Sequence, residues 1–432
     1  MIILTSIYMY AGTIVVPPFW HTMGFYRSSI IYIKLFLGKD FNYENPQGVA
    51  VTLFKEKDDP TTTKDDVILS LFGINSGRSQ IVYNVGMKAI KSYGKKGTGK
   101  GEFMEPYGIY ASPYGEVWVA DRGNNRVVRL KYKGDSLKWI STFYGFNKPT
   151  DLAIDYSGKV YVTDTGNNRV VVMDTSGNFI SEIKNLSAPF GIDVMDVSDP
   201  YNNTHMWGAK KEGFIIISDM HGLSLKKFDL AGKLVKTISV FDIGIVDSRF
   251  SYLSIDRFGN IYTTDKRNNT IHKFTKDFNY LTSVGKEGIG PYEFNSPTGI
   301  SIWKKYGQLY VAEAEGGQYY WLSVDAFLEG FFPEKFGNEE EGTTIGIYLT
   351  DFARLNIIIT DDNDEIVRDL TPKKYIAKPG EILVAWDGRD YEGKEVPPGR
   401  YKITIEITPQ QKLASYSKKI YKKVLEGYVW KY

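Results

Sequence analysis

Three stretches of the sequence repeat one pattern almost unchanged, and this repeat restricts the possible folds more than any other feature. The stretches are Glu116–Leu130, Lys159–Met173 and Asn260–Phe274. In each, a run of β-branched and aromatic residues ends at an Asp, a turn containing Asn follows, and a second apolar run begins. Since Asn and Gly accept positive φ and Asp can hydrogen-bond the turn backbone, each stretch predicts a β-hairpin.

Weaker copies of the pattern bring the number of repeats to six. They lie at Val67–Val82, Gly213–Phe228 and Gln308–Trp321. One polar position marks every copy: Asn75, Asp121, Asp164, Asp219, Asp265 and Glu313. The spacing of these positions is nearly regular, and the longest gap holds an insertion near residues 199–211. One short apolar strand precedes each hairpin and another follows it, so four strands per period predict an all-β, six-bladed β-propeller.

The repeat resembles the NHL repeat. The pattern Pro-x-Gly-Ile followed by Ile-Tyr-Val-x-Asp-x-Gly-Asn-Asn-Arg has its second half matched in full at Asp121–Arg126 and Asp164–Arg169, whereas Asp265–Thr270 lacks the final Arg. The resemblance covers roughly residues 28–325 and implies a propeller of the NHL type. It implies little about activity, because function depends on the site and not on the fold.

A second column of residues, the rim column, is a candidate ligand-binding surface. It follows the first residue of each blade, usually a Pro, and contains Gln47, Tyr107, Thr150, Phe190, Ser251 and Thr298. In a propeller these positions share one face with the hairpin turns, where His221 also falls. The mixture of aromatic and polar groups suits a shape-specific binding site. The alternative is that these side chains only fill the mouth of the channel.

We expect four segments along the chain. Residues 1–27 form an N-terminal apolar segment, residues 28–330 the propeller, residues 331–344 a polar linker, and residues 345–432 a small Ig-like or fibronectin-like β-sandwich with a basic, Tyr-rich tail. The tail either finishes the sandwich or docks on the propeller. Because the last repeat has no clear fourth strand, we expect Ile30–Leu37 to supply the outer strand of blade six and close the ring.

The C-terminal part alternates short apolar runs with turns, as a β-sandwich does. The stretch Trp386–Tyr401 resembles the Ig-like domain of the flagellar hook-cap protein (FlgD-like). The matching residues are Trp386, Asp387, Gly388, Asp390, Gly393, Val396, Pro397, Gly399 and Tyr401. Related modules recur at the C-termini of exported bacterial proteins, so the resemblance implies a surface or envelope protein.

The N-terminal segment Met1–Val16 carries no charged side chain and ends before two prolines. It is short for a membrane span, which needs about 20 residues. It suits the apolar region of a signal peptide, although no Lys or Arg precedes it. One interpretation is therefore an extracytoplasmic protein of the cell surface or periplasm, with no transmembrane span in the mature chain. The alternative is a strand that belongs to the folded domain.

Composition excludes several kinds of site. The chain has no Cys, which rules out disulfides, thiol catalysis and thiolate metal sites. Its only histidines are His21, His205, His221 and His272, and no two of them share a repeat position. Lys and Arg number 53 against 51 Asp and Glu. This balance argues against nucleic acid as a partner, since such binders usually carry a clear basic excess.

Three motifs resemble chemical sites but have simpler interpretations. Gly94–Lys100 fits the start of a phosphate-binding loop, yet Gly101 stands where Ser or Thr is needed, and Gly285–Phe294 repeats the layout. We expect both segments to be connectors between blades. Asp361–Glu365 contains part of a Ca²⁺-loop pattern, but it lacks the Gly and the distant Glu of an EF-hand, which favours a hairpin turn.

The acidic column is the remaining candidate for a metal. Carboxylates on neighbouring blades can bind Ca²⁺ through oxygen ligands, and Asp121, Asp164, Asp219, Asp265 and Glu313 are the weak candidates. The simpler interpretation is that each carboxylate caps its own turn and that Arg126 or Arg169 pairs with one of them. We therefore expect no cofactor and no catalytic residues.

Together these features favour a non-catalytic, extracytoplasmic binding or scaffold protein. Its propeller face would bind a protein, glycan or other envelope component, and its Ig-like domain would anchor or present the propeller. One alternative is a metal-assisted lyase or lactonase-like hydrolase at the propeller axis. The other is an intracellular protein- or RNA-binding propeller.

Overall fold

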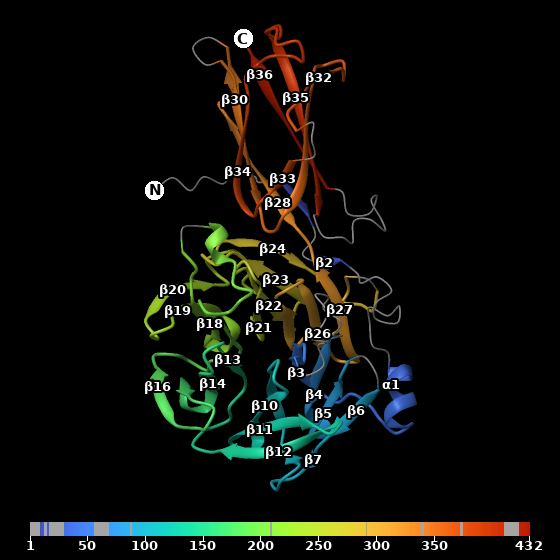
Figure 1. Ribbon diagram of the computed structural model, residues 1–432, viewed down its shortest axis with the longest axis vertical. Coiled ribbons are helices and arrows are strands. Elements are labelled where there is room, and N and C mark those ends of the chain that lie inside the picture. Colours follow the sequence, from blue (N-terminus) through green and yellow to red (C-terminus); the bar gives the residue numbers. More distant parts are fainter. Residues whose placement is uncertain are drawn as a thin grey trace. The chain divides into compact units, whose positions relative to one another are not determined.

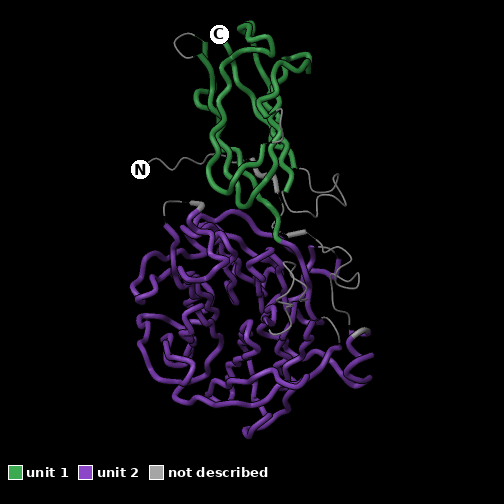
Figure 2. The backbone as a smooth tube through the Cα atoms, viewed as in Figure 1, with its two compact units in different colours: residues 1–16, 206–209, 322–432 green, residues 17–205, 210–321 purple. Residues whose placement is uncertain are grey.

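The computed structural model describes residues 9–12, 15–16, 30–55, 69–86, 89–207, 210–290, 292–337, 341–371, 375–409 and 423–432. The chain divides into two units (Figure 2). One unit contains residues 17–205 and 210–321, and the other contains residues 1–16, 206–209 and 322–432. The helices of the described segments are too short or too polar to span a membrane.

Within the described residues, the larger unit contains six sheets formed by the repeats and one two-stranded sheet of β7 (Lys95–Lys96) and β8 (Glu102–Phe103). The first sheet contains β3 (Pro46–Thr52), β4 (Ser70–Asn75), β5 (Gln80–Asn84) and β6 (Ile90–Tyr93), and the second contains β9 (Pro106–Ala111), β10 (Glu116–Asp121), β11 (Arg126–Lys133) and β12 (Ser136–Phe143). The third contains β13 (Leu152–Ile154), β14 (Val160–Asp164), β15 (Arg169–Met173) and β16 (Phe179–Ile183), and the fourth contains β17 (Ile192–Met195), β18 (Phe214–Asp219), β19 (Ser224–Asp229) and β20 (Leu234–Ser239). The fifth contains β21 (Leu253–Ile255), β22 (Ile261–Asp265), β23 (Thr270–Phe274) and β24 (Tyr280–Val284), and the sixth contains β25 (Ile300–Trp303), β26 (Gln308–Glu313) and β27 (Gly316–Leu322).

The six sheets formed by the repeats are the blades of a six-bladed β-propeller, as the repeat predicts (Figure 1). The first strand of each blade is the inner strand. Inner strands β3, β9, β13, β17, β21 and β25 contact one another in that order, and β25 contacts β3 again. Each blade is an open sheet, so the ring is completed by these contacts between inner strands. The blade interiors are filled by apolar residues, such as the fully buried Val117, Trp118 and Ile216.

The hairpin turns have the backbone geometry that their sequence predicts, with one difference. The second Asn of the motif is left-handed in all three clear copies: φ is 53° at Asn125, 53° at Asn168 and 54° at Asn269. The glycine of the motif does not have positive φ. Gly123 is needed for space instead, because a Cβ there would lie 2.6 Å from the side chain of Met104 and 2.7 Å from its carbonyl oxygen.

The prediction that Ile30–Leu37 supplies the outer strand of blade six is wrong. Residues Ile30–Leu37 form a helix, α1, which lies beside β6 of blade one. The fourth position in the sixth sheet belongs to the two-residue strand β2 (Val15–Val16). The helix buries Ile33, while Ile31 and Leu35 remain exposed.

The smaller unit is a β-sandwich. One sheet has the order β1 (Met9–Gly12), β28 (Asp325–Phe332), β30 (Thr343–Leu349) and β34 (Gly380–Trp386). The other contains β29 (Lys335–Phe336), β36 (Lys423–Lys431), β35 (Gly399–Pro409), β31 (Ala353–Thr360), β32 (Ile366–Asp369) and β33 (Tyr375–Ala377). Fully buried residues between the sheets, among them Ile345, Ile357 and Ile403, form one core.

Three predictions from the sequence can be compared with the structure of this sandwich. Its first strand after the propeller, β28, begins at Asp325, so the strand and not a linker occupies the start of the segment expected at 331–344. The end of the Tyr-rich tail, β36, pairs with β35 and finishes the sandwich. Within the N-terminal apolar segment, Met9–Gly12 pairs with β28, and residues 1–8 lie outside the described residues.

Candidate functional site

Aromatic side chains close one mouth of the propeller channel. We call this end, where the inner strands begin, the proximal face. The rings of Tyr107 and Phe190 meet edge to face with centroids 6.2 Å apart, and Phe190 meets Tyr252 in the same way at 5.1 Å. Phe190 and Tyr252 belong to the neighbouring blades four and five, whereas Tyr107 belongs to blade two, so the contact between Tyr107 and Phe190 joins blades that are not neighbours. We call the three residues the aromatic plug.

Polar neighbours hold the aromatic plug in place. The Tyr252 hydroxyl donates to Gln47 Oε1 at 3.1 Å, and Gln47 Nε2 donates to Asn45 Oδ1 at 2.8 Å. The Arg122 guanidinium lies over the Tyr107 ring, 4.8 Å from its centroid. Burial raises the pKa of Tyr252 well above its ordinary value. The proximal mouth is therefore a packed layer and not an open hole.

The rim column divides into buried and partly exposed residues. Gln47, Thr150 and Thr298 are buried, and Tyr107, Phe190 and Ser251 are partly exposed. The Thr150 hydroxyl donates to the Phe190 carbonyl at 2.9 Å, and the Thr298 hydroxyl donates to the Gln47 carbonyl at 3.3 Å. Tyr107 and Phe190 thus belong to the plug, and Gln47, Thr150 and Thr298 hydrogen-bond to it or to one another beside it. His221 lies apart from them, exposed on the turn of blade four.

Below the plug, side chains of one inner strand bond the backbone of the next inner strand. The backbone N–H groups of Ile192, Ile255, Ile302 and Val51 donate to Asp151 Oδ2, Asp193 Oδ2, Ser254 Oγ and Ser301 Oγ, at 3.2, 2.7, 3.1 and 3.1 Å. An inner strand has an edge that no strand of its own sheet covers, and unpaired N–H groups there would be costly when buried. Polar side chains in the channel therefore fasten one blade to the next.

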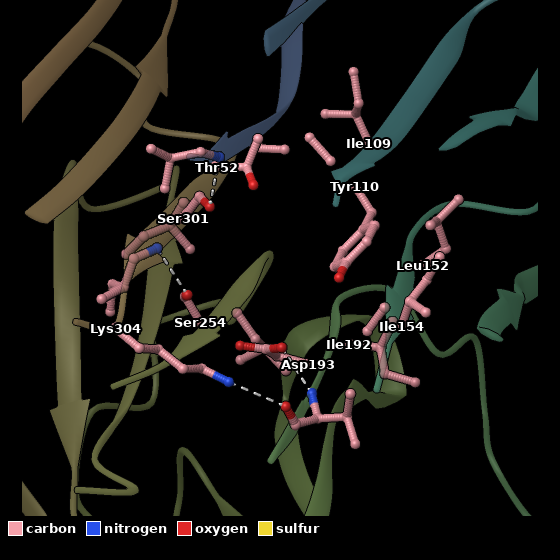
Figure 3. Close-up of a pocket in the computed structure, with 18 of the residues that line it drawn as sticks. Thr52, Ile109, Tyr110, Leu152, Ile154, Ile192, Asp193, Ser254, Ser301 and Lys304 are labelled. Atoms are coloured by element: carbon pink, nitrogen blue, oxygen red, sulfur yellow. Dashed lines mark hydrogen bonds between the residues drawn. The ribbon is translucent and has the colours of Figure 1, made fainter. Parts of the chain in front are cut away.

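The inner strands also enclose a cavity of about 190 Å³, which we call the axial pocket (Figure 3). Figure 3 shows the Tyr110 hydroxyl and the Asp193 carboxyl directed into it. Burial raises the pKa of the Asp193 carboxyl, although Lys304 and two backbone N–H groups act in the opposite direction. Burial raises the pKa of Asp151, which also lines the pocket, well above its ordinary value.

The insertion in blade four forms part of the wall at the other end of the pocket, the distal end. Asp199 Oδ2 lies 3.3 Å from Lys304 Nζ, which also donates to the Val194 carbonyl at 3.4 Å. The Tyr201 ring meets the Trp303 ring edge to face at 5.6 Å. Since Lys304 and Trp303 belong to blade six, the insertion connects two blades that are not neighbours. The sequence predicted the insertion but not its place at the pocket.

The residues of the acidic column are each buried within their own blade. Asp121, Asp164, Asp219, Asp265 and Glu313 are all 0% exposed. Backbone N–H groups of the preceding loop donate to four of them: Met104 to Asp121 at 2.8 Å, Asn147 to Asp164 at 2.6 Å, Ser187 to Asp219 at 2.7 Å and Asn295 to Glu313 at 3.0 Å. Within the described segments, no three His, Asp or Glu side chains gather into a group that could hold a metal.

Each carboxylate also has a side-chain partner in its own hairpin. The partners are Arg126 for Asp121 at 2.7 Å, Arg169 for Asp164 at 2.8 Å, Lys226 for Asp219 at 2.7 Å, His272 for Asp265 at 3.4 Å and Gln318 for Glu313 at 3.0 Å. The last three pairs replace the Arg that these repeats lack at the position five residues after the carboxylate. In this geometry the column caps turns and fastens loops, as its simpler interpretation requires.

The Asp265 interaction predicts a specific dependence of stability on pH. Burial acts to raise the pKa of Asp265, but hydrogen bonds from His272, Asn268 and Ser248 outweigh it and hold the pKa below its ordinary value. Its stabilising contribution is therefore present above the unfolded value of about 4 and is lost as the pH falls through the lower folded value. Asp265→Asn should be less stable than the parent at neutral pH, and the difference should shrink in acid. Urea unfolding at several pH values measures it, and a constant difference would contradict the assignment.

The glycine-rich connectors contain a carboxylate where a phosphate-binding loop would hold its ligand. Glu102 Oε2 accepts from the Gly99 backbone N–H at 2.9 Å, and Glu102 Oε1 lies 3.3 Å from Lys95 Nζ. The second connector repeats this arrangement with Glu293, Gly290 and Lys286. Each connector joins two blades, as predicted. Its glycine N–H and its lysine both interact with the glutamate of the same connector.

The other motif of the sequence forms a turn. Residues 361–365 connect β31 to β32, and Asp361 Oδ1 accepts from the backbone N–H groups of Asn363 and Glu365 at 2.8 and 3.0 Å. Of the remaining histidines, His205 is exposed and His272 is buried within blade five, whereas His21 lies outside the described residues.

Known protein families match one segment in the propeller and one in the C-terminal sandwich. A family model of the NHL repeat matches residues 146–173, and one of the FlgD Ig-like domain matches residues 335–411. The chain therefore contains an NHL repeat within its β-propeller and a C-terminal FlgD Ig-like domain. A search among curated proteins found no match.

Solved structures with some likeness to the chain are propeller proteins of different activities. Virginiamycin B lyase from Staphylococcus aureus is 16% identical, with 58% of this chain and 76% of that chain covered and a TM-score of 0.42. A gluconolactonase from Xanthomonas campestris is 12% identical, covering 65% and 88%, with a TM-score of 0.46. PorZ, a surface component of the type-IX secretion system of Porphyromonas gingivalis, is 13% identical, covering 89% and 51%, with a TM-score of 0.40. Likeness at this level does not assign an activity.

Proposed function

We propose that this chain is a non-catalytic, extracytoplasmic binding protein. Its propeller binds a protein, glycan or other envelope component, and its Ig-like domain anchors or presents the propeller. The observation that carries the proposal is the axial pocket, a cavity bounded by inner strands with polar groups directed into it. A concave site with a few convergent polar groups is the usual form of a small-ligand or side-chain pocket.

The hydrogen bonds of the pocket carboxylates support binding rather than catalysis. Asp193 Oδ1 accepts from the Val194 backbone N–H at 2.7 Å, and Asp193 Oδ2 accepts from the Ile255 backbone N–H at 2.7 Å. Each oxygen thus accepts one backbone hydrogen bond and keeps one further lone pair for a bound group. The FlgD Ig-like domain supports an extracytoplasmic location by resemblance, because related modules occur in exported proteins.

Two tyrosines at opposite ends of the channel test the proposal. Tyr156 lines the axial pocket and is 51% exposed, whereas Tyr107 belongs to the proximal plug. If the pocket is the binding site, Tyr156→Ala should weaken binding about tenfold, as loss of an aromatic contact often does. Tyr107→Ala should have a smaller effect. The matched control is Tyr144→Ala, because Tyr144 is 71% exposed and does not line the pocket.

The measurement is equilibrium binding of the full chain to isolated peptidoglycan, to surface polysaccharide and to solubilised envelope proteins. Binding that depends on Tyr156 but not on Tyr144 supports the proposal. The proposal is refuted if binding is unchanged in Tyr156→Ala. It is also refuted if the parent turns over a substrate and pocket variants abolish that turnover.

A second candidate function is a hydrolase or lyase at the propeller axis. It is favoured by the raised pKa of the buried Asp193 carboxyl in a pocket that also receives the Tyr110 hydroxyl, since perturbed acids in cavities often serve catalysis. Lactone and lyase substrates tested with the parent and with Asp193→Asn decide between the two functions. Turnover by the parent that this variant loses would favour the enzyme.

A further inference from the structure

The lining of the axial pocket has an excess of acidic side chains over basic ones. Five carboxyl groups and one amine lie in its lining: Asp151, Asp155, Asp193, Asp196, Asp199 and Lys304. Asp155 and Asp196 accept hydrogen bonds from the turns that follow them. Lys304 lies 3.3 Å from Asp199, so its charge is already paired. Deeper in the pocket, burial raises the pKa of Asp151 and Asp193, and their direct hydrogen-bond partners among the described residues are backbone N–H groups. A cation bound beside them would therefore stabilise their charged forms.

A second, independent observation indicates that the pocket accepts a hydrogen-bond donor. Thr52 lines the pocket and is 1% exposed, and among the residues that the structure describes none bonds its hydroxyl oxygen. Figure 3 shows this oxygen on the cavity side of the side chain, across from Tyr110 and Asp193. Buried hydroxyl groups nearly always have a partner, so an unpaired one in a cavity points to an absent ligand or to water.

We propose that the axial pocket binds a primary alkylammonium group, an inference that rests on the binding function proposed above. The ammonium carries three N–H donors, which suit acceptors directed into the pocket, namely the Thr52 hydroxyl and the Asp193 carboxylate. The alkyl stem would pass between aromatic residues of the lining, among them Tyr156 and Tyr201, whose ring faces attract cations. The cavity of about 190 Å³ is larger than one of about 150 Å³ that holds benzene.

The chemistry of the lining distinguishes this group from two others. A quaternary ammonium has no N–H donor and would leave Thr52 without a partner. An anion would need Lys304, which Asp199 already neutralises, and would be repelled by Asp193 and Asp151. The ammonium can belong to a free amine or to a lysine side chain of a peptide, and the two sources share the same contacts.

Calorimetric titration of the full chain tests the inference with four probes. These are 1,5-diaminopentane, a short peptide with one lysine, tetramethylammonium and glutarate. We expect saturable binding of the diamine or of the lysine peptide, and the tighter of the two identifies the source. Neither tetramethylammonium nor glutarate should compete. If glutarate binds and the amines do not, the inference is wrong.

Two substitutions give effects of opposite sign. Thr52→Val removes the hydroxyl at nearly constant volume and should weaken amine binding about tenfold, as loss of a hydrogen bond to a charged group does. Lys304→Met removes the resident cation and should tighten amine binding several-fold. The control is Thr360→Val in the Ig-like domain, where another hydroxyl lacks a partner among the described residues and binding should not change.

The outcomes separate this inference from the proposed function. If neither amine binds at millimolar concentration while binding of envelope material still depends on Tyr156, the inference fails and the binding function stands. If binding of envelope material is also independent of Tyr156, both fail. Loss of amine binding in Lys304→Met would likewise overturn the inference, because it would make the lysine a ligand and not a competitor.

Discussion

Replacing Arg126 with Met is expected to lower the free energy of unfolding of the propeller by about 3–5 kcal/mol, the usual cost of leaving a buried charge without its partner. The side chains of Arg126 and Asp121 are 4% and 0% exposed, and Arg126 Nε lies 2.7 Å from Asp121 Oδ2. The guanidinium also donates to the carbonyl oxygens of Thr98, Gly99 and Glu102, at 2.6, 3.3 and 2.8 Å. The variant therefore leaves four acceptors without this donor.

The matched control is Arg169→Met, which changes the same motif position in the next blade. Arg169 Nε lies 2.8 Å from Asp164 Oδ2, but the Arg169 side chain is 30% exposed. Water can therefore replace part of what the guanidinium provides, and the loss of stability should be smaller. The double variant Asp121→Asn/Arg126→Met should recover part of the stability that Arg126→Met loses, because it also removes the carboxylate left without its partner.

Urea unfolding followed by tryptophan fluorescence measures these differences. Trp139 is a local probe, since the Arg126 guanidinium lies 5.1 Å from the centroid of its ring. Equal midpoints for the two Met variants would mean that the burial of the Arg126 pair has no energetic consequence. The conclusion that the Arg of the motif stabilises the fold through its buried ion pair would then be wrong.

The blades could be predicted from the repeat because the residues that determine each hairpin turn lie within that hairpin. Asp121, Gly123 and Asn125 each have a separate physical role that recurs in the sequence. The carboxylate of Asp121 accepts from its own blade's leading loop, and Asn125 Oδ1 accepts from Lys148 N of the loop into the next blade at 2.8 Å. Absence of a Cβ at position 123 leaves room for the Met104 backbone. Such local signals are readable from one sequence.

Ring closure and the pocket were not predictable, because both depend on contacts between distant segments. An apolar run of eight residues such as Ile30–Leu37 fits either a strand or a helix. The choice depends on tertiary contacts, and the two-residue strand β2, which takes the fourth position in the sixth sheet, has no sequence signature. Likewise, the rim column could be aligned by its spacing, but only the structure shows that Tyr107 and Phe190 are in contact.

The junction between the last and first blades should be sensitive to a single methyl group at Gly299. The Gly299 backbone N–H donates to the Gln47 carbonyl at 3.1 Å, and a Cβ added at Gly299 would lie 2.5 Å from that oxygen and 2.5 Å from the backbone nitrogen of Val49. Both atoms are backbone, so no rotamer change relieves the clash. Gly299→Ala should therefore force β25 and β3 apart and cost about 3 kcal/mol, at the upper end of the usual range for overpacking.

The matched control is Gly73→Ala, which adds the same methyl group inside β4 of blade one. There the nearest atom to the new Cβ would be the Val82 carbonyl oxygen at 3.9 Å, an ordinary contact. That variant should be neutral or slightly stabilising, since alanine has less conformational freedom to lose on folding. If the two alanine variants unfold at the same urea concentration, the first and last blades can separate without cost. Closure of the ring would then depend on the outer strands and not on the close approach of the inner ones.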